Sequence, residues 1–264
     1  MYGFTYRGRH SSEFGITLLS SKINSPDLRE YEDEVTGLPG VIDYGTEFGK
    51  RQIDLSIDIT PSNEPFKVQQ SRIYNWLNPT QAAGVLVFDE TPDRYYYAKF
   101  TAKLGLQQIG KYGTFEFSMK CTDPFAYGYP HSMDQRHLYD FGLQYDSGLI
   151  YPNPTGFEWL YGEQRSSLQN YGPMETGIKI TIAGNAIGGS IEHEQSGKRL
   201  WLPTMIGQSL VIDTGEMTAN LNGLNALPQM SGDFFDLHPG VNGLIFRAAA
   251  ASAVVQYDWR FKYL

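Results

Sequence analysis

The residues from Arg51 to Ile59 alternate strictly between polar and apolar side chains. Successive side chains of an extended strand point to opposite faces, so this period of two predicts a half-buried β-strand. Such a strand requires a sheet with one covered face, and we expect Leu55, at its centre, to lie in the core. The apolar face of the strand consists of Ile53, Leu55, Ile57 and Ile59.

Other short apolar or alternating runs, separated by turn residues, predict further strands. They are residues 4–6, 15–19, 84–88, 94–102, 114–122, 177–183, 189–194, 198–202, 208–213, 243–247 and 252–261. Only residues 64–78 carry apolar side chains at helical spacing, and Pro79 follows them directly. The sequence therefore predicts a mostly β protein with one helix.

Two segments without a period divide the chain. Residues 26–47 are rich in glycine, proline and acids, and they predict a long loop or an extended hairpin arm. Residues 123–154 mix aromatics with glycine and proline, which predicts a domain boundary. We therefore expect an N-terminal domain at 1–130, a linker at 131–155 and a C-terminal domain at 156–264. The regularly spaced short strands of the last domain predict an antiparallel β-sandwich or jelly roll.

Composition excludes several classes of protein. The 264 residues include 29 acidic and 21 basic side chains, a formal net charge of −8, whereas dedicated nucleic-acid binders cluster Lys and Arg against phosphates. No apolar run suits a membrane helix and the N-terminus has no secretory signal, so we expect no membrane contact. The single cysteine, Cys121, excludes an internal disulfide, and we expect it to be a buried small hydrophobe.

No residue pattern predicts catalysis, a cofactor or a metal site, and we expect no enzyme. The five histidines are not spaced as paired metal ligands, and no nucleophile motif is present. The run Glu192-His193-Glu194 favours a solvated strand edge, and the glycine-rich run 184–189 favours a turn between two strands. Two acidic clusters keep a glycosidase open as an alternative. They are Asp89, Glu90 and Asp93, and Asp233 and Asp236.

Aromatic residues of the C-terminal domain leave open a second alternative, a carbohydrate-binding protein that recognises host cell-wall glycan. Exposed Trp and Tyr rings can stack on sugars, but the same rings can equally fill a sheet core. The candidates for glycan stacking are Trp159, Tyr161 and Trp201. Burial of all three would remove this alternative.

Weak motifs recur in a specific order along nearly the whole chain. In the N-terminal half they are residues 4–8, 11–16, Leu38-Pro39-Gly40, Tyr44-Gly45, the strand headed by Arg51, Trp76-Leu77, residues 95–98 and 114–125. In the C-terminal half they are residues 170–172, 197–200, 210–214 and 235–242. In this order and spacing the chain resembles the distal tail proteins (Dit) of long-tailed bacteriophages, especially those of Gram-positive hosts with non-contractile tails.

The resemblance implies a structural virion protein of the tail tip, assembled in the host cytoplasm, without catalytic residues or cofactors. It implies a ring, usually hexameric, in which N-terminal β-sandwich-like belt domains surround a channel that DNA only passes through. Galectin-like C-terminal sandwiches would project outward. The implied partners are further copies of the chain, the tail tube protein, a tail-associated fibre or lysin protein and a receptor-binding protein. The arm would join neighbouring subunits, and its candidate contact residues are Pro39, Gly40, Val41, Ile42 and Tyr44.

Overall fold

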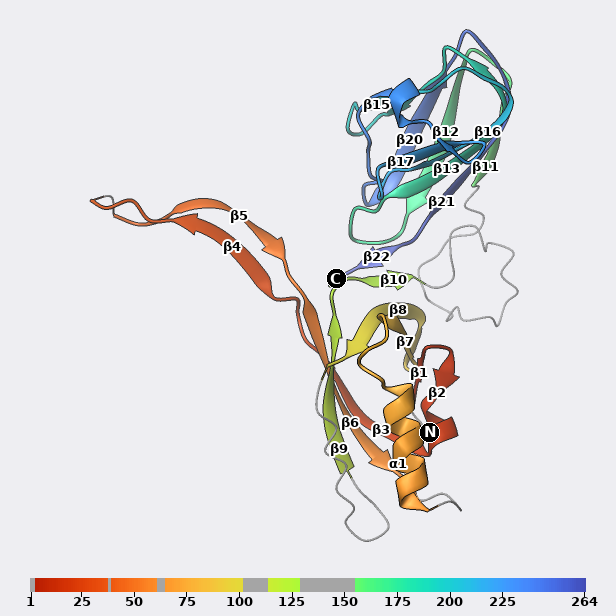
Figure 1. The fold of residues 1–264 in the computed structure, drawn as a ribbon. Coiled ribbons are helices and arrows are strands. Elements are labelled where there is room, and N and C mark those ends of the chain that lie inside the picture. Colours follow the sequence, from red (N-terminus) through yellow and green to blue (C-terminus); the bar gives the residue numbers. More distant parts are fainter. Residues whose placement is uncertain (1–2, 38, 61–64, 102–113, 129–154) are drawn as a thin grey trace. The chain divides into compact units, whose positions relative to one another are not determined.

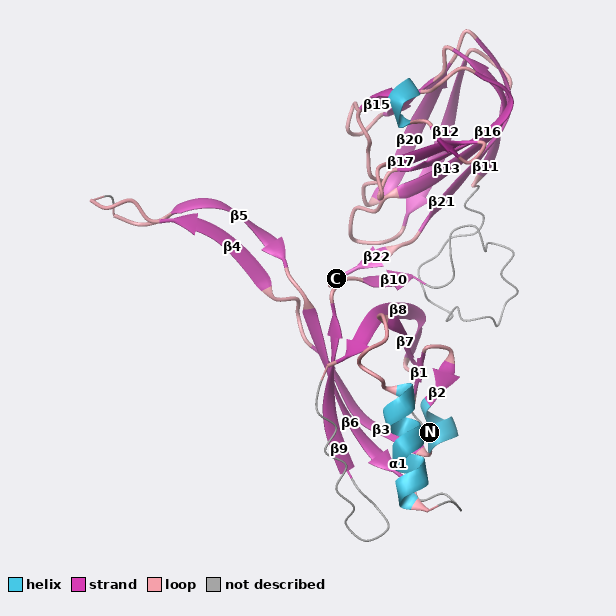
Figure 2. Ribbon diagram, in the orientation of Figure 1, coloured by secondary structure: helices cyan, strands magenta, loops and turns pink. Residues whose placement is uncertain are grey.

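The computed structural model describes residues 3–37, 39–60, 65–101, 114–128 and 155–264 (Figure 1). The chain divides into two compact units, residues 1–126 with Leu264, and residues 127–263. Both units consist mainly of β-strands (Figure 2), which confirms the predicted class. The linker predicted at 131–155 lies outside the described residues except for Thr155.

The first unit is built on one antiparallel sheet with the strand order β2-β1-β7-β8-β9-β6-β3. Its strands are β1 (Phe4–Tyr6), β2 (Arg9–His10), β3 (Ile16–Ile23), β6 (Arg51–Ile59), β7 (Gly84–Phe88), β8 (Thr91–Phe100) and β9 (Thr114–Cys121). A 3₁₀ helix, η1 (Ser11–Phe14), joins β2 to β3. Two further strands, β4 (Leu28–Asp33) and β5 (Ile42–Phe48), form a separate two-stranded sheet.

Strand β6 has the predicted bounds and the predicted alternation. It lies between β3 and β9, where Leu55 is opposite Phe117. Only 1% of Leu55 is exposed, so its predicted place in the core is confirmed. The other face of β6, which carries Asp54 and Ser56, is only partly covered.

Helix α1 (Phe66–Trp76) packs against the apolar side of the first unit through Ile73 and Trp76, both buried. The Trp76 ring stacks on Phe14 with centroids 4.3 Å apart, and its indole N–H donates to the Tyr6 carbonyl at 3.0 Å. The predicted helix is confirmed with a shorter span, and its expected first residue, Glu64, lies outside the described part. No described helix is long and apolar enough to cross a lipid bilayer.

The second unit is a sandwich of two antiparallel sheets, which confirms the predicted architecture. One sheet has the order β11-β21-β13-β16-β17-β18 and the other β12-β20-β14-β15-β19. Apolar side chains from both sheets, such as Ile182 and Phe246, form one core. The strands are β11 (Gly156–Trp159), β12 (Glu163–Asn170), β13 (Ile178–Ile187), β14 (Ser190–His193), β15 (Arg199–Trp201), β16 (Met205–Asp213), β17 (Thr218–Leu221), β18 (Leu224–Asn225), β19 (Ser231–Gly232), β20 (Gly240–Arg247) and β21 (Ala250–Trp259).

Three small elements complete the chain. A second 3₁₀ helix, η2 (Leu227–Gln229), follows β18. Strand β10 (Ala126–Gly128) pairs with β22 (Lys262–Tyr263), so the last strand of the chain returns to the segment with which the second unit begins.

The prediction of a solvated strand edge around His193 is wrong. Strand β14 lies inside its sheet, between β20 and β15, and His193 is fully buried. Its ring nitrogens lie 3.0 Å from Asn242 Oδ1 and 2.8 Å from Ser196 Oγ, and the ring stacks on Phe235. Burial lowers the pKa of this imidazole, and the hydrogen bond to Asn242 opposes that shift. His193 is therefore a hydrogen-bonded core residue.

The turn expected at 184–189 is confined to its last two residues. Strand β13 continues to Ile187 and carries a β-bulge between Gly184 and Ala186. Gly184 has φ of +133°, and a side chain there would collide with the Ser252 carbonyl of the neighbouring strand. The first glycine therefore permits a bulge within the sheet.

Candidate functional site

Strands β4 and β5 form a hairpin, called here the arm (residues 28–48), which extends away from the sheet of the first unit (Figure 1). Of the two conformations that the sequence left open, the structure shows the hairpin. Its strands pair from Leu28 opposite Phe48 to Asp33 opposite Ile42. Pro39, Gly40 and Val41 lie in the loop at its tip, and Ile42 and Tyr44 lie on β5.

Every described residue of the arm is exposed, including its large apolar side chains. The apolar side chains are Leu28, Tyr31, Val35, Val41, Ile42, Tyr44 and Phe48, and Tyr44 is 66% exposed. A β-bulge between Thr46 and Asp43 interrupts the period of β5, so Phe48 shares a face with Asp43, whereas Ile42 shares the other face with Glu47. So many exposed large apolar side chains on one hairpin are typical of a surface that binds another protein.

The arm is also strongly acidic. Residues 28–48 contain six carboxylates and one cation, Arg29, so they hold −5 of the net charge of −8. Glu32 lies directly opposite Asp43 across the two strands, an arrangement that destabilises a sheet. Within the described part of the chain, neither carboxylate forms an ion pair with Lys or Arg. The arm thus combines apolar surface with uncompensated negative charge.

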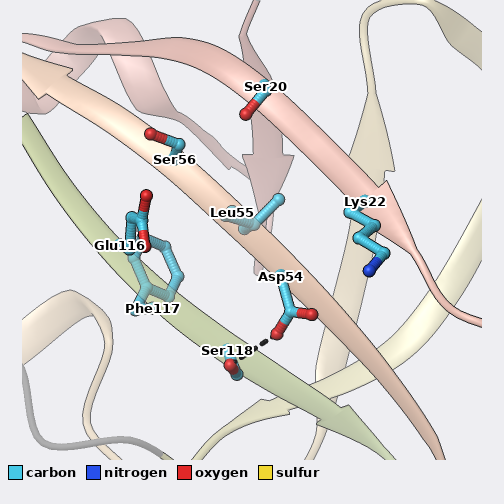
Figure 3. Close-up of a pocket in the computed structure, with 8 residues that line it drawn as sticks. All are labelled: Ser20, Lys22, Asp54, Leu55, Ser56, Glu116, Phe117 and Ser118. Carbon is cyan, nitrogen blue, oxygen red and sulfur yellow. Dashed lines mark hydrogen bonds between the residues drawn. The ribbon is translucent and has the colours of Figure 1, made fainter.

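The uncovered face of β3, β6 and β9 is polar and slightly hollow (Figure 3). Asp54, near its centre, accepts hydrogen bonds from Ser118 Oγ at 2.6 Å, Gln52 Nε2 at 2.7 Å and Asn24 Nδ2 at 2.8 Å. These bonds lower the pKa of the Asp54 carboxyl, Ser118 contributing most. The carboxylate is therefore ionised at neutral pH and held in place, and the hollow offers hydroxyl and carboxylate groups to solvent.

Two of the carboxylates weighed for a glycosidase lie near a cation or an imidazole. Asp89 lies 3.2 Å from His10 Nε2, and Asp93 lies 3.5 Å from Arg94 Nε. Glu90, in the turn before β8, is exposed. The second acidic cluster, Asp233 and Asp236, lies between β19 and β20.

The three aromatics proposed for glycan stacking have different environments. Trp159 is 1% exposed and stacks on Phe246 with centroids 3.7 Å apart, so it has no ring face to offer a sugar. Tyr161, in the turn after β11, is 69% exposed, and Trp201, at the end of β15, is 46% exposed. The candidate set is thus corrected to Tyr161 and Trp201.

Trp201 adjoins a network of ion pairs on the outer face of its sheet. The Arg199 guanidinium lies 5.6 Å from the Trp201 ring centroid and donates to Glu192. Glu192 also accepts from Arg247 Nη1 at 2.6 Å, and Arg247 Nε donates to Glu163 at 2.8 Å. The hydrogen bonds from Arg199 and Arg247 lower the pKa of Glu192. This network was not predicted from the sequence, because its members lie on four strands that only the sheet register brings together.

Cys121 is buried on β9, as expected, and burial raises the pKa of its thiol to about 12. Such a thiol is unreactive at neutral pH. Among the described residues, no three His, Cys, Asp or Glu side chains are grouped to hold a metal ion.

Two family models match the chain, one over each unit. The phage tail protein RIFT-related domain matches residues 9–121, and the C-terminal domain of the siphovirus-type tail component matches residues 172–263. The chain belongs to the distal tail protein family of siphophages. This confirms the resemblance found in the sequence, and it makes the chain a structural component of the virion tail.

Solved structures were also compared with this chain, and one of them shares its fold. The crystal structure of the Dit protein (gp 19.1) of phage SPP1 matches over 100% of both chains with a TM-score of 0.74 at 13% identity. Two structures of activated phage P2 baseplates, with Ca and with Sr, match with TM-scores of 0.47 at 10% identity. These two cover 99% and 98% of this chain and 98% of the chains they match. A search of curated proteins found no match.

Proposed function

We propose that this distal tail protein forms a closed ring, a hexamer, that joins the tail tube to the tail tip or baseplate and its adsorption apparatus. The first unit forms the belt of this ring, and DNA passes through its lumen. The Dit protein of phage SPP1 is described as a paradigm of the hub adsorption apparatus in phages that infect Gram-positive bacteria. The common fold supports the same role here.

The proposal rests mainly on the structure of the arm. Its apolar side chains are exposed and, among the described residues, β4 and β5 pair only with each other, yet it forms a hairpin rather than a loop. A two-stranded ribbon alone is at best marginally stable in water, so a binding partner would complete it. In a cyclic ring every copy can place its arm on the next copy, which satisfies all arms at once. Pro39, Gly40, Val41, Ile42 and Tyr44 remain our candidate contact residues.

The polar face of β3, β6 and β9 suits the wall of a DNA channel. Its described side chains mix hydroxyls and carboxylates, such as Ser56, Asp54 and Glu116, with Lys22. Tight DNA binding requires clustered cations, so a wall of mixed charge lets the genome pass without holding it.

The remaining functional proposals follow from a place at the tail tip. The ring contacts the tail tube protein on one side and a tail-associated fibre or lysin protein on the other, and it carries a receptor-binding protein where a baseplate exists. We propose that it assembles in the host cytoplasm, uses no cofactor, catalyses no reaction and meets DNA only in transit.

Light scattering after gel filtration tests the ring. Six copies of the 29.8 kDa chain have a mass of about 180 kDa, and we expect this species for the wild-type chain. Deletion of residues 30–46 should leave both units folded, because the arm is exposed throughout, but should shift the mass towards that of a monomer. A ring that survives the deletion would contradict the role of the arm.

Glycan binding by the second unit is the alternative function that one observation favours. Trp201 offers a half-exposed ring beside the fixed donors and acceptors of Arg199, Glu192 and Arg247, which is a chemistry suited to sugars. A host cell-wall glycan array tests it, with Trp201→Ala against wild type and Tyr161→Ala as a second variant. Binding lost in Trp201→Ala would support this function, and equal signals from wild type and both variants would refute it.

A further inference from the structure

The first unit carries a basic pocket of about 410 Å³ near its N-terminus. Arg7, Arg9 and Arg72 line this pocket, and the rings of Phe14 and Trp76 form part of its wall. None of the described residues that line it is acidic. The pocket therefore presents positive charge next to apolar surface, which is the complement of the arm.

The arginines of the pocket are held in place by their surroundings. The Arg9 guanidinium lies 4.4 Å from the Phe14 ring centroid, and it pairs with Glu13 at 2.9 Å. Arg7 donates to Gln81 and to the carbonyl of Ala82. A guanidinium has five N–H donors, so these contacts leave donors for a carboxylate from outside. Positioned cations of this kind lose little entropy on binding.

From this complementarity we propose that the pocket binds the acidic arm of a second copy of this chain. The arm holds −5 of the protein's charge, and Glu32 and Asp43 lie opposite each other without a cation in the described part of the chain. Figure 1 shows the arm directed away from α1 and β2, the elements that carry the pocket, so the arm of the same chain does not fill it. Guanidinium groups from a neighbour would relieve the repulsion between the two carboxylates.

This docking rests on the proposed ring and specifies which surfaces of neighbouring copies meet. The arm and the pocket are different surfaces of one chain, so head-to-tail repetition of their contact around an axis closes a ring when the rotation permits. Each copy would then supply one arm and one pocket, and none would remain unfilled. A two-fold dimer that exchanges its two arms reciprocally also fills both pockets, and its mass of about 60 kDa distinguishes it from the hexamer.

Charge reversal tests the pairing in the full-length chain. Glu32→Lys with Asp43→Lys reverses the charge of the facing pair on the arm, and Arg9→Glu with Arg72→Glu reverses the charge of the pocket. We expect each double variant to raise the apparent dissociation constant for self-association about ten-fold or more, measured across a concentration series. Raised salt should weaken self-association of the wild-type chain in the same way. The chain that carries all four changes should associate within about three-fold of wild type, because the charges again match.

Matched controls change the same charge elsewhere. Glu158→Lys with Glu216→Lys, and Lys179→Glu with Lys198→Glu, lie on exposed positions of the second unit and should leave association unchanged. The melting temperature of every variant shows whether it is folded, and recovery in the four-fold variant would itself exclude misfolding as the cause.

The outcomes separate this inference from the proposed function. If the wild type forms a ring that needs the arm but tolerates both charge reversals, the pocket is not the receptor and the ring proposal stands. If the wild type and the 30–46 deletion are both monomeric at every concentration, both proposals fail. If the pocket variant loses affinity for a short DNA duplex but keeps its self-association, the pocket is a phosphate site and this inference is wrong.

Discussion

Strand β5 ends at Phe48 and β6 begins at Arg51, yet every residue of β5 is exposed while alternate residues of β6 are buried. Both strands carry apolar side chains, although a β-bulge interrupts β5. The difference lies in what covers those side chains, because β6 has β3 and β9 beside it and a core beneath it, whereas among the described residues β5 pairs only with β4. Apolar alternation therefore identifies β6 and its buried face, whereas the exposed apolar side chains of β5 lack a covering layer in the described part of the chain, and we place that layer in another molecule.

The largest expected effect is the loss of a core side chain from β6. Leu55→Ala should lower the free energy of unfolding by about 2–5 kcal/mol, from lost burial and the cavity left opposite Phe117. Denaturant unfolding of the two chains measures it. An unchanged midpoint would show that β6 is no more buried than β5.

The reactivity of the thiol on β9 reports whether the strand next to β6 stays buried in the folded protein. Cys121 lies opposite Arg51, it is fully buried, and its pKa is raised to about 12 by that burial. We expect thiol reagents at pH 8 to react with it only as fast as the first unit unfolds. The control chain carries Val41→Cys on the arm in a Cys121→Ser background. If Cys121 in the native chain is labelled as fast as this exposed cysteine, the prediction is wrong.

The polar face of β6 should contribute less to the free energy of unfolding than its apolar face, and this contribution should depend on pH. Hydrogen bonds lower the pKa of Asp54 below its ordinary value of 3.8, so their stabilisation is complete above that value and is lost as the pH falls through the lowered pKa. At pH 7 we expect Asp54→Asn to cost about 0.5–1 kcal/mol, reduced by solvent screening. The difference between the two chains should shrink towards pH 3, measured by thermal melts across a pH series.

The smallest effect on stability is expected on β5. Tyr44→Ala should change the free energy of unfolding of the dissociated chain by less than about 0.5 kcal/mol, because the side chain is mostly exposed. The same substitution should reduce self-association, measured by light scattering. A large loss of stability with association unchanged would show that the arm packs within its own chain, as β6 does.

Strands with apolar alternation were predictable from the sequence, and β6 was predicted to the residue. Strand β12 was not, because the side chains it turns inward include Ser166 and Asn170. Tyr257 Oη donates to Ser166 Oγ at 3.3 Å, and Asn170 Nδ2 donates to the Met174 carbonyl at 3.0 Å. Buried polar residues with such partners break the period on which strand prediction depends.

The pocket of Arg7, Arg9 and Arg72 could not be found from the sequence for a different reason. Two of its cations lie near the N-terminus and the third on α1, more than sixty residues later. The acidity of the arm, by contrast, was visible in a single continuous segment. Local composition reveals a surface made by one segment, whereas a surface made by several requires the fold.

The sequence by itself determined the class of the fold, the buried face of β6, the burial of Cys121 and the family, because each rests on a local period or on the order of motifs along the chain. Only the tertiary structure decided that Trp159 is buried while Trp201 is half exposed, and that His193 lies in a core. The physical reason is that burial of a side chain depends on what lies across the sheet. For Trp159 that is the ring of Phe246, almost ninety residues away, and for Trp201 it is Arg199 and solvent.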